Sequence, residues 1–339
     1  MNGASSTSPA AGVPSGTILV AGACGFIGAY LCRHFAERGA SVLAVDGPSG
    51  IDWRIRDVPG IRRVKLDLSS WPDVKDVMAR EQPAIVINCA AYGAYSSQTD
   101  AERIYRVNLH AVRYLLEAAR ELPHLRAFIQ AGSSSEYGLN CSAPSEDSPT
   151  RPDSDYAASK IGATAVTQFY ALKHGLPAWV FRLYSVYGPL EDFSRLMPRL
   201  LLEARHRRLP PLVNPAISRD FVFVDDVCRA VESLVERGPS LRPGEIYNIG
   251  TGVRTTLGDL VSVVRSTFDV PSEPQWGSMP DRAWDHPDWY ADPRKAKRDF
   301  GWSASVSLRD GLLATMRWLE NNPKLVAEGQ QSSVLPVKS

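Results

Sequence analysis

The sequence has no excess of charge of either sign. Its 339 residues carry 38 Lys and Arg against 37 Asp and Glu, which gives a formal net charge of +1. Nucleic acids and acidic membrane surfaces are usually bound through a strongly basic chain, so we expect neither as a partner. The basic run at residues 205–208 is typical of a solvated helix end.

Paired cysteines and long apolar runs are also missing. The five cysteines form no Cys-x-x-Cys pair and the six histidines show no metal-ligand spacing, so we expect neither a disulfide framework nor a metal site. No segment reaches the roughly 20 apolar residues that span a bilayer, and the first residues lack the basic start and apolar centre of a signal peptide. These features predict a cytoplasmic protein.

Apolar residues make up 44% of the chain and follow alternating strand and helix patterns from Thr17 onward. This alternation predicts an α/β fold, a parallel sheet with helices on both faces. After Pro189 the chain is rich in proline and arginine, which indicates a smaller α/β lobe. The expected organisation is a tail (1–15), a sheet domain (16–188, joined by 220–228 and 246–252), a smaller lobe (189–325) and a second tail (326–339).

A glycine-rich loop directly follows the first expected strand and opens the first expected helix. Its glycines let the backbone approach a pyrophosphate, and the helix N-terminus supplies amide donors. The second expected strand ends in Asp46, whose carboxylate would accept hydrogen bonds from a ribose and repel a 2′-phosphate, so we predict NAD as the cofactor. Asp67 and Leu68, after the third strand, are candidates for contacting the adenine. The loop residues are Gly22, Ala23, Cys24, Gly25, Phe26, Ile27 and Gly28.

Two segments carry side chains suited to proton transfer. Tyr156 and Lys160 are four residues apart and therefore share one face of an expected helix. The ammonium favours the phenolate form of Tyr156, which makes the tyrosine a candidate proton shuttle. Lys160 is also a candidate to anchor the nicotinamide ribose. Upstream, the turn at residues 132–138 brings Ser133 and Ser134 to the end of a strand, where open α/β sheets bind ligands.

With these motifs the sequence resembles the extended short-chain dehydrogenase/reductase family, in its nucleotide-sugar epimerase and dehydratase branch. The resemblance implies a Rossmann-type, doubly wound dinucleotide-binding domain with bound NAD and a carboxyl-terminal substrate lobe that binds a nucleoside diphosphate sugar. It also implies a homodimer formed by helices near 103–120 and 157–174. It further implies that Ala90, Ala91 and Asn108 belong to the cofactor site, and that Tyr156 takes a sugar hydroxyl proton while hydride passes to NAD. The resemblance covers residues 17–320, and it includes Tyr187-Gly188-Pro189 and the runs 219–227 and 247–252.

The expected substrate contacts are mainly arginines, because a guanidinium meets phosphate oxygens in pairs. Arg219 is the first candidate and Arg282 the second. Ser134 is expected to contact the sugar and Leu196 to frame the nucleobase. Ser185 stands where many relatives carry an asparagine toward the sugar diphosphate, and its shorter hydroxyl cannot replace an amide.

The turn at residues 132–138 is the place where the reactions of this branch differ. Family 4,6-dehydratases carry a glutamate three residues before the closing glycine, where it removes the proton beside the new ketone. Here that position is Ser135, and Glu136 follows one residue later, where an extended chain would direct it to the opposite side. We therefore favour an epimerase that oxidises and re-reduces one sugar carbon, expected to be carbon 4.

Three alternatives remain open at this point. In a 4,6-dehydratase, Ser135 and Glu136 would be catalytic. A reductase of a nucleoside diphosphate 4-keto sugar would also suit the turn. A non-catalytic NAD-binding sensor is the alternative outside enzymes, because a fold by itself does not establish a function.

Overall fold

A seven-stranded parallel sheet forms the centre of the computed structural model, which describes residues 15–95, 97–278 and 287–334. Its strand order is β10-β6-β5-β4-β1-β2-β3, so the order reverses between β1 and β4. In such sheets, ligands bind beyond the carboxyl ends of the strands at the reversal point. The strands are β1 (Thr17–Ala21), β2 (Ser41–Asp46), β3 (Ile61–Lys65), β4 (Ile85–Asn88), β5 (Ala127–Ser133), β6 (Ala178–Leu183) and β10 (Ile246–Ile249).

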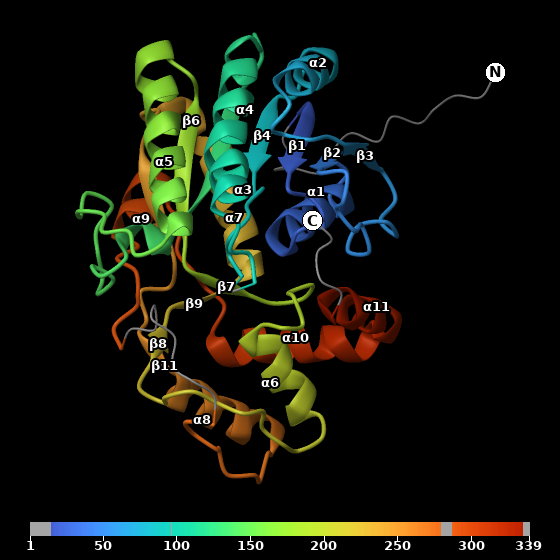
Figure 1. Ribbon diagram of the computed structural model, residues 1–339, viewed down its shortest axis with the longest axis vertical. Helices are drawn as coiled ribbons and strands as arrows, with labels where there is room; N and C mark the ends of the chain where they lie inside the picture. Colours follow the sequence, from blue (N-terminus) through green and yellow to red (C-terminus); the bar gives the residue numbers. More distant parts are fainter. Residues whose placement is uncertain (1–14, 96, 279–286, 335–339) are drawn as a thin grey trace, which may run out of the picture.

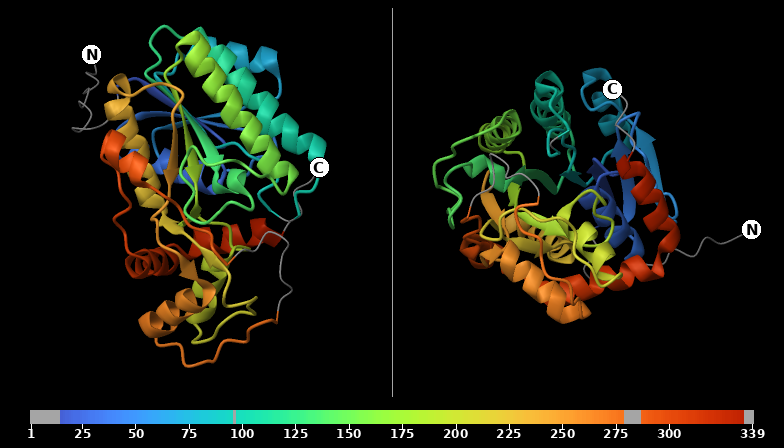
Figure 2. Two further views of the ribbon diagram at one scale, coloured as in Figure 1. Left: turned by 90° about the vertical axis from the view of Figure 1, so that its left-hand side faces the viewer. Right: turned by 60° about the horizontal axis from the view of Figure 1, so that its bottom comes forward.

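Helices cover both faces of this sheet (Figures 1 and 2). Along β1, Ile18 and Val20 face the core beneath α1 and α7, whereas Leu19 and Ala21 face the core beneath α2, α4 and α5. Both sets are apolar because both faces are buried, as the alternation of side chains along a strand requires. The helices are α1 (Phe26–Glu37), α2 (Trp71–Glu81), α3 (Ala101–Tyr105), the π-helical turn Arg106–His110, α4 (Ala111–Arg120), α5 (Asp155–His174) and α7 (Val224–Arg237).

A smaller lobe lies beyond the carboxyl ends of the strands, at the bottom of Figure 1. Its strands pair as β7 (Ser185–Tyr187) with β9 (Phe221–Phe223) and β8 (Ser218–Arg219) with β11 (Thr255–Thr256). Helix α8 packs against both α6 and α10. The remaining helices are α6 (Leu196–Ala204), α8 (Leu257–Phe268), α9 (Arg294–Phe300), α10 (Leu308–Asn321), α11 (Pro323–Val334) and the 3-10 turns Ser134–Tyr137 and Gly238–Ser240.

The carboxyl end of the chain differs from the sequence expectation. A tail was expected from residue 326, whereas residues 323–334 form helix α11. Val326 is buried, and Gly329 lies so close to Phe193 and Trp53 that an added Cβ would meet the Trp53 ring at 2.8 Å. Because a glycine makes this contact, apolar periodicity gave little sign of it. Among the described residues, no helix has both the length and the apolar character that crossing a membrane requires.

Candidate active site

The glycine-rich loop after β1 is shaped by close backbone contacts. Gly22 has φ of +75°, and a Cβ on it would lie 2.6 Å from the amide nitrogen of Ala90. A Cβ on Gly28 would lie 2.9 Å from the carbonyl carbon of Gly22. Gly25 begins α1 without a side-chain cap, so the amides of the first turn, at Phe26 and Ile27, lack a side-chain acceptor. This side-chain-free cradle at a helix N-terminus fits the pyrophosphate of NAD.

Asp46 joins the end of β2 to the glycine-rich loop. Its Oδ2 accepts a hydrogen bond of 2.6 Å from the amide of Cys24. Burial, together with the nearby Asp46 charge, raises the pKa of the Cys24 thiol to about 12, so this cysteine stays protonated near neutral pH. The carboxylate therefore lies at the loop, where the sequence analysis expects a ribose.

The expected adenine side is formed by the ends of β3 and β4. Leu68 is buried and Asp67 exposed, and the Oδ1 of Asp67 accepts hydrogen bonds from the amide and the hydroxyl of Ser69. The hydrogen bond from the Ser69 hydroxyl is the main reason why the pKa of Asp67 is lowered. Ala90 is half-buried and touches the Gly22 position, whereas Ala91 is exposed. Ala90 therefore lies at the glycine-rich loop, whereas Asp67 and Leu68 follow the edge strand β3 at the same end of the sheet.

Asn108 does not fit the direct cofactor role expected for it. It is fully buried in the π-helical turn. Its Nδ2 donates to the carbonyl of Tyr92 at 2.8 Å and to the hydroxyl of Ser159 at 2.9 Å, and its Oδ1 accepts from the amide of Tyr92 at 2.8 Å. Both amide hydrogens are therefore used within the protein. Asn108 holds the segment after β4 against α5 and has no donor left for NAD.

Tyr156 and Lys160 lie in the first turns of α5, one turn apart. Ser154 caps this helix by accepting a hydrogen bond from the amide of Ala157 at 3.2 Å. Lys160 is buried, and its Nζ donates to the carbonyl oxygen of Ala131, near the end of β5, at 2.5 Å. Tyr156 is half-buried, and its ring lies beside Gly93, in the segment after β4. The pair thus contacts the segments at the ends of two neighbouring strands, β4 and β5.

The serine-rich turn follows β5 directly. The hydroxyl of Ser133 caps it by accepting from the amide of Ser135 at 3.1 Å, and donates to the hydroxyl of Ser135 at 3.0 Å. Ser134 is buried with 7% of its surface exposed. Three hydroxyls are therefore packed at the carboxyl end of β5, in the region that also contains Lys160.

Glu136 is enclosed by the protein. It has no exposed surface. Its Oε1 accepts from the amide of Ser133 at 2.9 Å, and its Oε2 accepts from the Thr164 hydroxyl at 2.8 Å and pairs with the guanidinium of Arg182 at 2.9 Å. A carboxylate held by three donors inside the protein has no path to a sugar. The catalytic role reserved for Glu136 under the dehydratase alternative is therefore not supported. The reason differs from the expected one, because residues 134–137 form a 3-10 turn instead of an extended chain, and the acid is held in the interior by its three donors.

Trp289 was not among the residues predicted for the site, but it contacts two of them. Its indole Nε1 donates to the hydroxyl of Ser134 at 3.0 Å, and its own amide donates to the hydroxyl of Ser218 at 2.9 Å. The guanidinium of Arg219 lies 5.0 Å from the centre of its ring. Trp289 thus connects the turn after β5 with the arginine expected to bind phosphate. Ser134 and Trp289 are 155 residues apart, so no local pattern signals the contact.

The remaining substrate candidates lie where the lobe meets the sheet. Ser185 begins β7 and donates its amide to the carbonyl of Asp220. Arg219 is half-buried and donates to the carbonyl of Ser218. Leu196, also half-buried, begins α6. Arg282 lies outside the described residues.

Asp220 joins two of the segments that carry the family resemblance, residues 219–227 and 247–252. Its carboxylate is buried and accepts hydrogen bonds from the amides of Thr251, Gly252 and Ala291 and from the Thr251 hydroxyl. Burial raises the pKa of Asp220, and these donors act against that shift. The residue fastens the lobe to the loop after β10, which keeps Arg219 beside the site.

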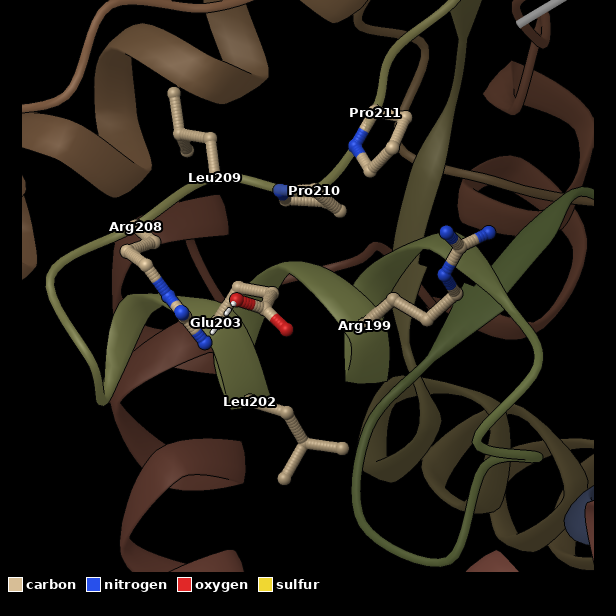
Figure 3. A pocket seen from close by; sticks show the side chains of 7 residues that line it. All are labelled: Arg199, Leu202, Glu203, Arg208, Leu209, Pro210 and Pro211. Atoms are coloured by element: carbon tan, nitrogen blue, oxygen red, sulfur yellow. Dashed lines mark ion pairs between the residues drawn. The ribbon is translucent and has the colours of Figure 1, made fainter.

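A pocket of about 420 Å³ lies in the lobe, on the second half of α6 and the segment that follows (Figure 3). Arg208 and Glu203 form an ion pair of 3.1 Å at its edge. None of the residues predicted for the active site lines it. Its lining residues are Arg199, Leu202, Glu203, Arg208, Leu209, Pro210 and Pro211.

Comparison with known proteins assigns the chain to a family. The model of the NAD dependent epimerase/dehydratase family matches residues 18–250, about two thirds of the sequence. The chain belongs to this family. Membership confirms the resemblance and the fold class predicted from the sequence, and it confirms NAD as the cofactor.

Individual relatives in this family carry out more than one reaction. A dTDP-glucose 4,6-dehydratase of Streptomyces griseus is 30% identical over 317 residues, covering 89% of this chain and 93% of the relative. A UDP-glucose 4-epimerase of Mycolicibacterium smegmatis is 29% identical over 316 residues, covering 89% and 98%. A Bacillus cereus UDP-glucuronic acid 4-epimerase, solved with UDP-glucuronic acid and NAD, has a TM-score of 0.78 at 25% identity, covering 90% and 99%.

Proposed function

We propose that this protein is an NAD-dependent nucleotide-sugar epimerase that inverts carbon 4 of a nucleoside diphosphate sugar. The observation that carries the proposal is the turn after β5. The position of the dehydratase glutamate is Ser135, and the acid beside it, Glu136, is buried against Arg182. Elimination of water needs an acid/base pair at this turn, whereas epimerisation needs a group that takes and returns one hydroxyl proton.

Each side chain has a defined part in this reaction. Tyr156 takes the proton from the sugar hydroxyl and returns it after the carbon has been re-reduced on its other face. Lys160, held by the carbonyl of Ala131, stands one helical turn from Tyr156 and anchors the nicotinamide ribose. The Ser134 hydroxyl accepts from Trp289 and donates its own hydrogen to the reacting oxygen. Ser133 contributes a second hydroxyl once its hydrogen turns from Ser135 to the substrate. Bound NAD would supply a reversible hydride acceptor at this site, so that the reaction needs no external oxidant or reductant.

The substrate is held from the lobe. Arg219 binds the diphosphate, since it lies on the lobe side of the site and carries a charge that a diphosphate complements. Arg282 is the second proposed phosphate ligand. Ser185 and Leu196 contact the sugar diphosphate and the nucleobase. The relative solved with UDP-glucuronic acid supports a nucleoside diphosphate sugar as the substrate class.

A 4,6-dehydratase is the second candidate, because a relative that is 30% identical carries that name. It would need an acid at the turn from a residue other than Glu136. A 4-keto-sugar reductase also suits the hydroxyl-rich turn. Reductases, however, release oxidised cofactor at each turnover and commonly use NADPH, whose 2′-phosphate the Asp46 carboxylate would repel.

One assay separates these candidates. The purified protein is incubated with a panel of nucleoside diphosphate sugars in deuterated water, and products are analysed by mass spectrometry and NMR. A product of equal mass, without solvent deuterium on carbon and without net change in NAD, supports the epimerase. Loss of one water contradicts it in favour of a dehydratase, and turnover only with added reduced cofactor contradicts it in favour of a reductase.

We further propose a homodimer that pairs the α3–α4 region and α5 with those of a second copy. Two large apolar side chains of α5 are exposed, Phe169 with 53% and Leu172 with 59% of their surface. Exposed apolar groups on one helix face favour a protein contact. Light scattering after gel filtration should give twice the chain mass, and Phe169→Glu should lower it. A monomeric wild-type protein contradicts the proposal.

A further inference from the structure

Arg54 lies against the glycine-rich loop, in the segment between β2 and β3. Its Nη1 donates to the carbonyl oxygen of Cys24 at 3.0 Å, and its Nε donates to the carbonyl oxygen of Leu190 at 2.8 Å. Its guanidinium lies 4.3 Å from the centre of the Trp53 ring. One side chain thus joins the loop after β1 to the segment that follows β7.

Arg54 is a half-buried cation that is held by carbonyl oxygens and an aromatic ring. In the part of the chain that the structure describes, its guanidinium forms hydrogen bonds to carbonyl oxygens and no ion pair with a carboxylate. Burial lowers the pKa of Arg54, although Asp192 and Asp46 act in the opposite direction. A partly buried cation without an ion-pair partner favours an anion nearby.

Helix α11 fixes the segment that carries Arg54. Trp53 is buried, its ring stacks on that of Phe193 with centres 6.4 Å apart, and α11 packs on both rings through Gly329. Farther out, Arg56 forms an ion pair with Glu328 of α11. Figure 1 shows α11 just below α1. The carboxyl-terminal helix is therefore connected to the glycine-rich loop through Trp53 and Arg54.

We propose that Arg54 is a ligand of the NAD pyrophosphate and that helix α11 is the element that holds it there. The pyrophosphate brings two negative charges to the loop to which Arg54 is bonded, and a guanidinium pairs well with phosphate oxygens. This role adds a cation to a cradle otherwise made of backbone amides and a helix N-terminus. It concerns cofactor retention and holds for any of the sugar reactions.

The first test measures how fast bound NAD exchanges with radiolabelled NAD, and how much NAD the purified protein contains. Arg54→Met should weaken NAD binding by about 10- to 100-fold, the range for a hydrogen bond to a charged group. Arg54→Lys, which keeps the charge, should restore most of that loss. Arg62→Met is the matched control, because Arg62 is exposed on β3 and pairs with Glu81.

Two results would overturn the role of Arg54. One is NAD exchange in Arg54→Met at the wild-type rate. The other is an Arg54→Lys variant as weak as Arg54→Met, which would mean that Arg54 only braces two loops. Circular dichroism of each variant establishes that the fold is retained.

The second test concerns α11. Gly329→Val should displace the helix from Trp53 and Phe193 and speed up NAD exchange several-fold, whereas Gln330→Val, on the exposed side of the same helix, should not. A milder variant, Glu328→Arg, places like charges together and should also speed up exchange. The double variant Arg56→Glu with Glu328→Arg should restore it.

The outcomes keep this inference separate from the proposed reaction. If Gly329→Val exchanges NAD like Gln330→Val while Arg54→Met is impaired, the part assigned to α11 is wrong. If the sugar assay instead yields a dehydrated product, the epimerase is wrong, and the NAD exchange rates of all these variants are unaffected.

Discussion

The loop after β1 and the turn after β5 lie at the same edge of the sheet but are built in opposite ways. The first is a cradle from which side chains are excluded, since a Cβ at Gly22 would meet the backbone of Ala90. The second is packed with side chains, and its acid is held by Arg182 and Thr164. The glycine-rich loop can be recognised from its glycines alone. The structure of the serine-rich turn depends on partners that come from distant parts of the chain.

This difference explains why family membership identifies the cofactor as NAD but does not identify the reaction. A dehydratase and an epimerase match this chain at 30% and 29% identity over nearly its whole length. Overall identity therefore does not distinguish the two reactions for this chain. The epimerase proposal depends instead on Ser135 and on the buried position of Glu136 in the turn after β5.

The largest effect, on both NAD binding and stability, should come from adding a side chain to the glycine-rich loop. Gly22→Ala adds a methyl group 2.6 Å from the Ala90 amide nitrogen at φ of +75°, so NAD binding should be lost and stability should fall by about 2–5 kcal/mol. The control is Gly39→Ala, at φ of +83° with no atom within 4 Å of the added methyl. It should cost only the backbone term, about 1–2 kcal/mol. Equal losses of stability and bound NAD in both variants would contradict the close approach.

The next effect concerns the proton shuttle. Tyr156→Phe removes the hydroxyl and should lower turnover by about 10²- to 10⁴-fold while bound NAD is kept. Tyr105→Phe is the matched control, because Tyr105 donates an exposed hydrogen bond of 3.0 Å to Asp155 at the start of the same helix. It should leave turnover nearly unchanged. Steady-state kinetics and NAD content measure both, and a Tyr156→Phe variant with wild-type turnover would exclude this tyrosine as the shuttle.

Glu136→Gln tests whether the acid in the turn after β5 is structural or catalytic. The substitution leaves Arg182 buried without its counter-charge, so the free energy of unfolding should fall by roughly 3 kcal/mol. Turnover of the folded protein should change little. Asp76→Asn, in an exposed pair with Arg80, should cost less than 1 kcal/mol by the usual value of about 0–1 for surface pairs. A collapse of turnover at full stability would favour the dehydratase.

The limits of sequence-based prediction follow the same division. The strand, loop and helix around Gly22, the place of Asp46 at the end of a strand and the shared helix of Tyr156 and Lys160 depend on local patterns, and these could be predicted. The role of Asn108 could not, because its partners Tyr92 and Ser159 come together only in the folded protein. Helix α11 was missed because a glycine makes its central contact.

The smallest effect should come from one hydrogen bond across the two lobes. Trp289→Phe removes the Nε1 donor of the Ser134 hydroxyl but keeps a ring under Arg219, so turnover should fall by up to about tenfold with the folded state retained. Trp179→Phe is the matched control, because its indole donates at 2.9 Å to the carbonyl of Arg242, which is outside the predicted site. It should lower stability without changing turnover per folded molecule. Ser134→Ala should remove most of the additional effect of Trp289→Phe, since both changes break the same bond. Fully additive losses would mean that Trp289 acts on the reaction by another route than through Ser134.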